Sequence, residues 1–355
     1  MTMTMRMMLA AGCMLAVFAS GQAQAANLLD WLAAGRSGTQ PAAPADAARL
    51  VTLEPDENEM YPEVSPDGKH LLAAVVHGGK QVWVSRRLAE NGDPLNVVTD
   101  DARAVGSVRW HGAGAVSFLS LRAGSPGLWT RAADGKGLVR RVAELTPDLA
   151  QPQLLADGGV LAVRVRPAAR SGARGASDGF DNWSFAGAGS DIVRVEASGN
   201  AHVLAQGANP ALSPDGQWIA FTMAAGRSRH LFLMRVDGGS LMQLTDARSI
   251  DVQPAWSPDG RWIVFTSNRA DADMRHPGKG NWDIWAVDRE GRNLTQLTRD
   301  AARDGAPSVA PDGTVYFHSE REIGKPEAEA HQVRRGTRGF HVWRVAFPAP
   351  ENAVH

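Results

Sequence analysis

Three acidic side chains recur at one spacing and could bind a cation. They are Glu59, Asp251 and Asp304, and each stands three residues before a proline. If the surrounding segments are structural repeats, the three carboxylates occupy equivalent positions around a channel mouth. There they could hold a cation or a basic segment of a partner. Alternatively, each carboxylate bonds the backbone amides of its own loop, a common role for Asp, and we favour this second interpretation.

A second group of residues could bind a protein partner. Charged and aromatic side chains gather in three long segments, 167–190, 270–282 and 320–339, and Arg and Trp are frequent anchors of protein interfaces. The candidates for a partner-binding face are Trp183, Arg269, Asp271, Asp273, Arg275, His276, Trp282, Arg321, Arg334 and Arg335. We expect Trp183 and Trp282 to be exposed. A solvated charged surface is the alternative for any single charged residue.

Catalytic motifs are missing from the sequence. It contains no Gly-x-Ser-x-Gly elbow, no His-Glu-x-x-His pair and no phosphate-binding loop. Asp271 and Asp273 lack the Gly and Glu of a calcium loop. The only cysteine is Cys13, so a mature chain without it offers no thiol nucleophile. We therefore expect a non-catalytic protein with no cofactor and no metal.

The first 25 residues have the pattern of a secretory signal. Arg6 precedes an apolar stretch over 7–18, and Ala-Gln-Ala at 23–25 is a typical cleavage site. We expect cleavage after Ala25 and a periplasmic location. A membrane anchor is the alternative, but the stretch is short and nothing later is long enough to span. Lipidation at Cys13 is a further alternative. A net charge of −1 gives no field that would favour nucleic acid.

One turn is written four times and predicts how the chain is built. Ser-Pro-Asp-Gly occurs at 65–68, 213–216 and 257–260, and Ala-Pro-Asp-Gly occurs at 310–313. Proline presets φ, Asp bonds the amides that follow, and Gly takes the left-handed position. Such a turn joins two antiparallel strands. Its recurrence predicts an array of similar β units.

The units can be counted. They fall at 61–99, 105–143, 152–205, 209–246, 253–299 and 306–347, although 111–114 and 156–159 carry degenerate turns. Four short strands per unit predict an all-β, six-bladed β-propeller. We expect no helix after residue 45. The last unit lacks a fourth strand, and 49–53 resembles one, so this N-terminal strand should complete the last blade and close the ring.

The repeats resemble a known family. Residues 253–299 contain Ser-Pro-Asp-Gly, Ser-Asn-Arg, Asp-Ile-Trp and Leu-Thr-Gln-Leu-Thr in order, and this pattern is similar to the TolB-like propellers of the periplasmic Tol system. The predicted organisation is a signal over 1–25, a tether over 26–44, a propeller over 45–347 and a tail over 348–355. Only about 20 residues separate signal and propeller, so we expect no TolB-type N-terminal domain.

The resemblance implies a function. A TolB-like propeller would act as a monomeric scaffold for protein–protein interaction, with envelope proteins as partners and a role in envelope integrity or transport. The alternative is a propeller that binds or cleaves carbohydrate, with Trp183 and Trp282 stacking on sugar rings. A metal-dependent lyase of this kind needs several histidines in its channel. His111 is the only histidine near a predicted channel strand.

Overall fold

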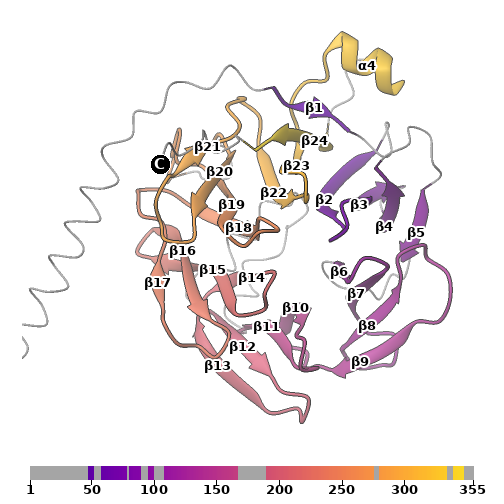
Figure 1. The fold of residues 1–355 in the computed structure, drawn as a ribbon, viewed down its shortest axis with the longest axis vertical. Helices are drawn as coiled ribbons and strands as arrows, with labels where there is room; N and C mark the ends of the chain where they lie inside the picture. Colours follow the sequence, from indigo (N-terminus) through magenta and orange to yellow (C-terminus); the bar gives the residue numbers. More distant parts are fainter. Residues whose placement is uncertain are drawn as a thin grey trace, which may run out of the picture.

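The described residues form six four-stranded antiparallel sheets around a ring (Figure 1). The computed structural model describes residues 47–51, 57–77, 80–88, 95–99, 108–166, 189–275, 280–333 and 339–347. The predicted signal, tether and tail lie outside these residues. The prediction of a six-bladed propeller is confirmed.

Each blade uses four strands in chain order, except that the last blade takes its outermost strand from the N-terminal side. Blade one contains β2 (Asn58–Val64), β3 (His70–His77), β4 (Lys80–Arg87) and β5 (Asn96–Thr99). Blade two contains β6 (Arg109–His111), β7 (Ala115–Ser120), β8 (Gly127–Ala132) and β9 (Arg140–Glu144). Blade three contains β10 (Leu149–Leu154), β11 (Val160–Val165), β12 (Ser190–Val195) and β13 (Ala201–Gln206).

The other three blades follow the same order. Blade four contains β14 (Ala208–Leu212), β15 (Trp218–Ala225), β16 (Ser228–Arg235) and β17 (Met242–Gln243). Blade five contains β18 (Asp251–Trp256), β19 (Trp262–Ser267), β20 (Asp283–Asp288) and β21 (Thr295–Gln296). Blade six contains β22 (Asp304–Val309), β23 (Thr314–Ser319), β24 (His341–Ala346) and β1 (Arg49–Leu50).

The predicted ring closure is confirmed. β1 pairs antiparallel with β24, with Leu50 opposite Trp343. The next residue continues the pairing, because Val51 N donates to Val342 O at 2.8 Å. Closure gives the third strand of blade six a neighbour on both sides.

The core lies between the blades. In blade three Leu161 and Ile192 are completely buried, and they pack in one cluster with Ile219 and Phe221 of blade four. Because each sheet is covered on both faces, its central strands are nearly continuous apolar runs. This explains why β11, β15 and β19 show little polar alternation.

One element contradicts the sequence prediction. A short helix, α4 (Lys325–His331), forms in the segment between β23 and β24, where we expected none. Pro326 lies in its first turn, where the missing N–H costs nothing. Ala328 is its only buried residue, so seven residues gave no helical period to detect. Ala328 packs in the same cluster as Leu50 of β1 and Trp343 of β24, so the helix covers the closure strand.

Candidate functional site

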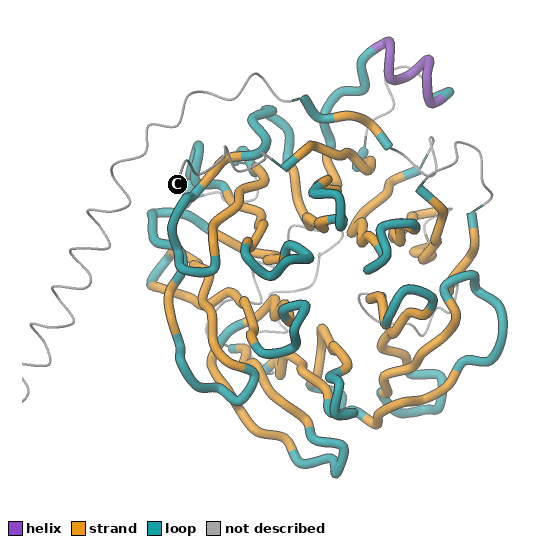
Figure 2. The backbone as a smooth tube through the Cα atoms, viewed as in Figure 1, coloured by secondary structure: helices purple, strands orange, loops and turns teal. Residues whose placement is uncertain are grey.

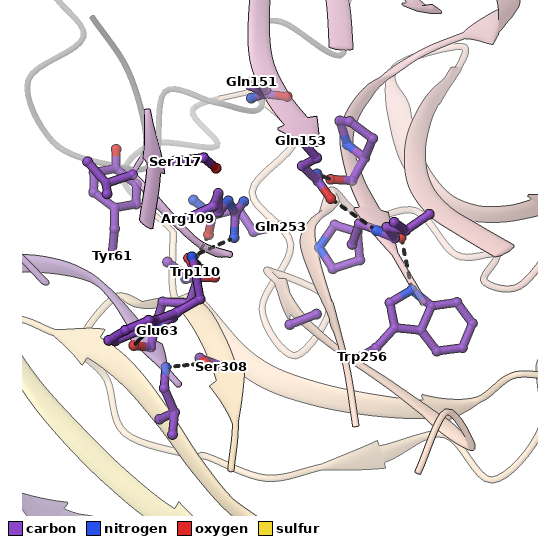
Figure 3. Close-up of a pocket in the computed structure, with 18 of the residues that line it drawn as sticks. Tyr61, Glu63, Arg109, Trp110, Ser117, Gln151, Gln153, Gln253, Trp256 and Ser308 are labelled. Atoms are coloured by element: carbon purple, nitrogen blue, oxygen red, sulfur yellow. Dashed lines mark hydrogen bonds and ion pairs between the residues drawn. The ribbon is translucent and has the colours of Figure 1, made fainter. Parts of the chain in front are cut away.

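The innermost strands of all six blades line a central channel of about 900 Å³ (Figure 3). The lining of blade one runs from Tyr61 to Pro66, and that of blade six runs from Ala306 to Pro311. Figure 2 shows that the loops after the innermost strands (teal) gather around the centre of the ring. The channel is a direct result of arranging the six described blades in a ring.

A backbone irregularity recurs along the channel wall. In five innermost strands the residue before the proline has positive φ, between 49° and 54°. These residues are Tyr61, Gln151, Asn209, Gln253 and Ala306. The strand register shifts at each of these positions, so each is a β-bulge. Residues other than Gly seldom adopt this conformation, so the surrounding contacts must hold it in place.

At three of the five bulges, a side chain from the preceding blade accepts the N–H of the bulge residue. Gln151 Oε1 accepts the N–H of Asn209 at 2.9 Å, and Gln253 Oε1 accepts the N–H of Ala306 at 2.8 Å. Blade six has Ala306 at this position, which offers no acceptor. His318 of β23 replaces it, and its Nδ1 accepts the N–H of Tyr61 at 3.0 Å.

A second level of such bonds lies nearer the turns. Glu63 Oε1 accepts the N–H of Trp110 at 3.2 Å, and Ser308 Oγ accepts the N–H of Val64 at 3.0 Å. Gln153 Oε1 accepts the N–H of Leu212 at 3.2 Å. The innermost strands are edge strands, and these bonds satisfy backbone groups that would otherwise point into the channel.

In blades three, five and six, the N–H group at this second level receives no acceptor from the preceding blade. The donors are Leu154, Trp256 and Val309, which occupy the same position in their strands as Val64 and Leu212. The following residue of each strand bonds the neighbouring strand, so by antiparallel alternation these three N–H groups face the channel.

The preceding blades explain the missing acceptors. In the preceding blades, the position that would supply the acceptor to Trp256 is Ala211, and that for Val309 is Ala255; neither has a polar side-chain atom. The corresponding position for Leu154 is Arg109, whose side chain can only donate. Within the described part of the chain, the three N–H groups therefore remain available to a ligand.

One buried acceptor in the channel wall also lacks a partner. Asn209 lines the channel and is 8 % exposed, and its Oδ1 accepts no hydrogen bond from the described residues. Asn is one methylene shorter than the Gln residues that bond the bulges in blades three and five. An unpaired buried carbonyl oxygen is costly, so this atom requires a donor from water or from a ligand.

One ion pair lies inside the channel. Arg109 Nη1 is 3.5 Å from Glu63 Oε2, and the two side chains are 45 % and 22 % exposed. Burial raises the pKa of Glu63, while the charge of Arg109 and the bond from Trp110 oppose that rise. Of the described residues that line the channel, only Glu63 is acidic.

The predicted channel-mouth carboxylates lie elsewhere. Glu59, Asp251 and Asp304 are fully buried and do not line the channel, so that placement is wrong. Asp251 Oδ2 is 2.5 Å from Arg269 Nη2, and Asp304 Oδ2 is 2.6 Å from Arg321 Nη2. Glu59 Oε2 accepts the N–H of Val342 in blade six at 3.2 Å. We favoured bonds from each acid to the backbone amides of its own loop. The bonds named here go instead to arginine side chains and to the backbone of another blade, so they do not follow that interpretation.

The arginines complete a repeated clasp in blades five and six. The guanidinium of Arg269 lies over Phe265 and Trp285, with its carbon 5.3 and 5.4 Å from the ring centres. That of Arg321 lies over Phe317 and Trp343 in the same way. Burial would raise the pKa of Asp251, but the charge of Arg269 and bonds from neighbouring side chains lower it to about 2. The clasp is thus a charged, structural unit.

The predicted partner-binding face is divided by the structure. The side chains of Arg269 and Arg321 are 7 % and 6 % exposed in the clasps. Trp282 is 0 % exposed, so the expectation of an exposed Trp282 is wrong. Trp282 packs with Met60, Val252 and Phe340, among others. Asp271, Asp273 and Arg275 are exposed. Trp183, His276, Arg334 and Arg335 lie outside the described residues.

The residues that line the channel were not chosen from the sequence. A signal was present, because an amide residue precedes proline at 151–152, 209–210 and 253–254. Among the described residues, no group of three or more His, Cys, Asp or Glu is arranged to hold a metal ion. In the same residues, no helix has the length and apolar character needed to cross a membrane.

Comparison with known proteins supports the fold. A family model described as the TolB beta propeller domain matches residues 191–273, so the resemblance to TolB is confirmed over that part of the chain. No curated protein sequence matches the chain.

Solved structures with the same architecture come from several functional classes. A protein described as a TolB from Agrobacterium tumefaciens is 18 % identical, with a TM-score of 0.56, and the match covers 85 % of this chain and 97 % of that one. An oligogalacturonate lyase in complex with manganese is 14 % identical, with a TM-score of 0.51 over 86 % and 95 % of the two chains. A calcium-binding regucalcin from Agrobacterium tumefaciens is 14 % identical, with a TM-score of 0.52 over 85 % and 94 %. At identities this low, the structural similarity shows a shared fold and nothing more.

Proposed function

We propose that this chain is a non-catalytic periplasmic binding protein, a monomer whose central channel receives a segment of an envelope protein. The observation that carries the proposal is the set of unpaired polar groups in the channel wall. Leu154, Trp256 and Val309 present backbone N–H groups there, and Asn209 presents a carbonyl oxygen. A polypeptide segment carries both the acceptors and the donors that these groups lack.

Two further observations agree with a protein ligand. The cavity of about 900 Å³ is large enough for several residues of an extended segment. The matched TolB propeller model and the similarity to a TolB structure make a binding role in the envelope the natural starting hypothesis. The periplasmic location depends on the export signal predicted over residues 1–25.

Photo-crosslinking in cells tests the proposal. A photoreactive residue replaces His111, which is exposed and lines the channel. The matched control replaces Leu138, which is 78 % exposed on the outer part of the same blade. We expect a discrete protein adduct from position 111 and none from position 138. No adduct from position 111 of a folded, exported protein, or equal adducts from both positions, would contradict the proposal.

A second candidate function is carbohydrate binding or cleavage. The observation that favours it is the Glu63–Arg109 pair, since a carboxyl with a raised pKa beside an arginine in a cavity is a common catalytic arrangement. An oligogalacturonate lyase shares the fold. Incubation with oligogalacturonides, followed by ultraviolet detection of unsaturated products, tests this candidate. Turnover that disappears in Glu63→Gln would replace the binding proposal, and no turnover would remove the candidate.

A further inference from the structure

One mouth of the channel lies on the face of the Pro-Asp-Gly turns. Four turn prolines belong to the channel lining, Pro66, Pro214, Pro258 and Pro311. At the other end the described lining stops at the bulge residues in most blades, but in blade three it continues past the bulge to Ala150, Val163 and Val165. Met60 and Val252, which directly precede two of those bulges, are buried in the cluster with Trp282 and Phe340. A ligand that enters from the turn face therefore meets the turns first.

Four carboxylates stand at this mouth. Asp67, Asp215, Asp259 and Asp312 each follow a lining proline, and all four are exposed. They belong to blades one, four, five and six, which are consecutive around the closed ring. The turns of blades six and one touch, because a Cβ on Gly68 would lie 3.1 Å from Cδ of Pro311. The four residues form what we call the acidic arc.

The turn fixes each carboxylate and leaves one oxygen free. Oδ1 accepts the backbone N–H two residues later, at 2.9–3.1 Å in the four turns. In three turns a serine hydroxyl donates to the same oxygen. The Ser65 hydroxyl lowers the pKa of Asp67, and the Ser213 hydroxyl does the same for Asp215, so both stay ionised. No described residue bonds the Oδ2 atoms.

The rest of the mouth has a different charge. Blade two has Gly112 and Ala113 in place of the acidic turn, and it places Arg109 and His111 in the channel wall. In blade three, Asp157 is paired with Arg194. At the described mouth, the acids without a salt bridge are therefore those of the acidic arc, although the charges of Lys69 and Arg289 also act on Asp67 and Asp215.

The channel behind the arc supplies an independent requirement for a donor. Asn209 Oδ1, in blade four, is a buried acceptor with no partner and lies in the channel wall. Lys and Arg side chains are donors without acceptors, so they would pair with the arc, and inside the channel they would bond this oxygen once the Asn209 side chain turns toward them. The carbonyl groups of the same segment would accept from Trp256 and Val309 N–H.

From this arrangement we infer that the channel selects a basic segment of its protein partner, which enters past the acidic arc. The inference rests on the proposed function and names the chemistry of its ligand. Charge complementarity at a mouth of this kind mainly raises the rate of association and discriminates against acidic partners. Its contribution weakens as salt screens the exposed carboxylates.

Three fluorescent decapeptides of Gly and Ser test the inference, one with four Lys, one with four Glu and one uncharged. Binding is followed by fluorescence anisotropy at low and near-physiological salt. We expect the Lys peptide to bind at least tenfold more tightly than the other two, with affinity falling as salt rises. Equal binding of the Glu or uncharged peptide would overturn the inference, and this comparison needs no variant.

A quadruple variant tests the arc itself: Asp67→Ser, Asp215→Ser, Asp259→Ser and Asp312→Ser. Ser keeps a turn-forming oxygen, whereas Asn before Gly would deamidate back to an acid. The matched control is Asp134→Ser with Asp237→Ser, in outer turns of the same face whose Oδ1 atoms also bond a backbone N–H. We expect the quadruple variant to bind the Lys peptide at least tenfold less tightly and the control to be unchanged.

Equal losses in variant and control would contradict a role for the arc. If the quadruple variant does not fold, the pair Asp259→Ser and Asp312→Ser gives a smaller loss of the same kind. The inference and the proposed function fail separately. A His111 crosslink that persists while the Lys peptide shows no preference would leave the binding function in place and remove the basic ligand. Asn209→Ala should weaken Lys-peptide binding without changing its salt dependence.

Discussion

At the scale of residues, the buried charges hold blades together. Asp251 bonds Arg269 of its own blade and also Thr245 Oγ1 of blade four at 2.6 Å. A buried ion pair contributes little net stability, but removing one partner leaves an uncompensated charge. The acid-before-proline spacing, which suggested a ligand site, therefore identifies the point where a blade is attached to its neighbour.

The first prediction concerns this clasp. Arg269→Met leaves Asp251 buried and unpaired, and we expect the free energy of unfolding to fall by about 3–5 kcal/mol. Arg275→Met, at an exposed arginine in the same segment, is the control and should change it by less than about 0.5 kcal/mol. Urea denaturation measures both. A loss for Arg269→Met no larger than that of the control would show that the clasp does not stabilise the fold.

The second prediction concerns His318. Its Nδ1 must stay unprotonated to accept the Tyr61 N–H, and burial together with the charge of Arg303 lowers its pKa from 6.5 to about 3. His318 is therefore protonated near pH 6.5 in the unfolded chain but only near pH 3 in the native protein. Stability is complete above pH 6.5 and falls on acidification through that window, by up to about 1.4 kcal/mol per pH unit.

Urea denaturation between pH 4.5 and pH 7 measures this dependence. His318→Gln keeps an acceptor that does not titrate, so its stability should vary less across the window. Asp251 does not interfere there, because its own contribution is lost only as pH falls from 3.8 towards about 2. Parallel pH profiles for the two proteins would show that His318 is not the titrating group.

The sequence allowed some residue roles to be predicted and concealed others. The Pro-Asp-Gly turns have the bonds expected of them, with Asp67 Oδ1 accepting from Lys69 N. The burial of Trp282 could not be predicted, because it depends on Met60 of another blade, more than 200 residues earlier. Which partner an acid finds is likewise a property of blade packing and not of local spacing.

At the scale of elements, closure depends on a very short strand. β1 is two residues long, and Val51 adds one more bond. Its stability must therefore come from packing as well as from hydrogen bonds. Leu50 is buried against Trp343, and the segment around α4 contributes Ile323 and Val333 to the same cluster.

The third prediction is that Val51→Pro weakens the closure. Proline removes the N–H that bonds Val342 O, and β1 then keeps only its first two residues. We expect a clear fall in melting temperature, measured by circular dichroism. The control is Val203→Ala, at an exposed position of the outer strand β13. An unchanged melting curve for Val51→Pro would remove the proposed importance of this bond.

The fourth prediction concerns the cover formed by the α4 segment. Ile323→Ala removes buried methyl groups from the cluster that contains Leu50, and we expect a loss of about 2–4 kcal/mol. The control is Leu294→Ala, at a large hydrophobic residue that is exposed. Equal small losses in urea denaturation would show that the segment does not support the closure strand.

The closure strand was predictable and the cover was not. A fourth-strand pattern without a local partner stands before the first unit, and a unit without a fourth strand ends the array. The segment that contains α4 carries Lys325, Glu327 and Glu329, a composition typical of a solvated loop. Its isolated apolar residues at 323, 328 and 333 acquire a role only when β1 lies beneath them.

At the scale of the whole molecule, the blades are not independent. One cluster contains Val264 and Ile284 of blade five together with Val315 and Phe317 of blade six. We therefore expect a single cooperative unfolding transition, with coincident curves from circular dichroism and tryptophan fluorescence. Separate transitions for the two probes would contradict this expectation.

The architecture followed from local signals, whereas the channel did not. Turn chemistry and strand patterns repeat along the chain and count the blades. The groups that a ligand would meet depend on which side chain of one blade lies beside the backbone of the next. Asn209 differs from Gln253 by one methylene, and only the assembled ring shows what that difference leaves unpaired.

Where a side chain bonds a bulge, it comes from the preceding repeat, and this restricts how such a chain can evolve. Gln253 serves Ala306, but Ala306 cannot serve Tyr61, and His318 does so from a different strand. A copy of blade six inserted after blade four would therefore bring its own histidine, whereas a copy of blade five would bring a glutamine. Gene duplication or recombination between repeats changes two junctions at once, so substitutions in neighbouring blades must be inherited as matched pairs.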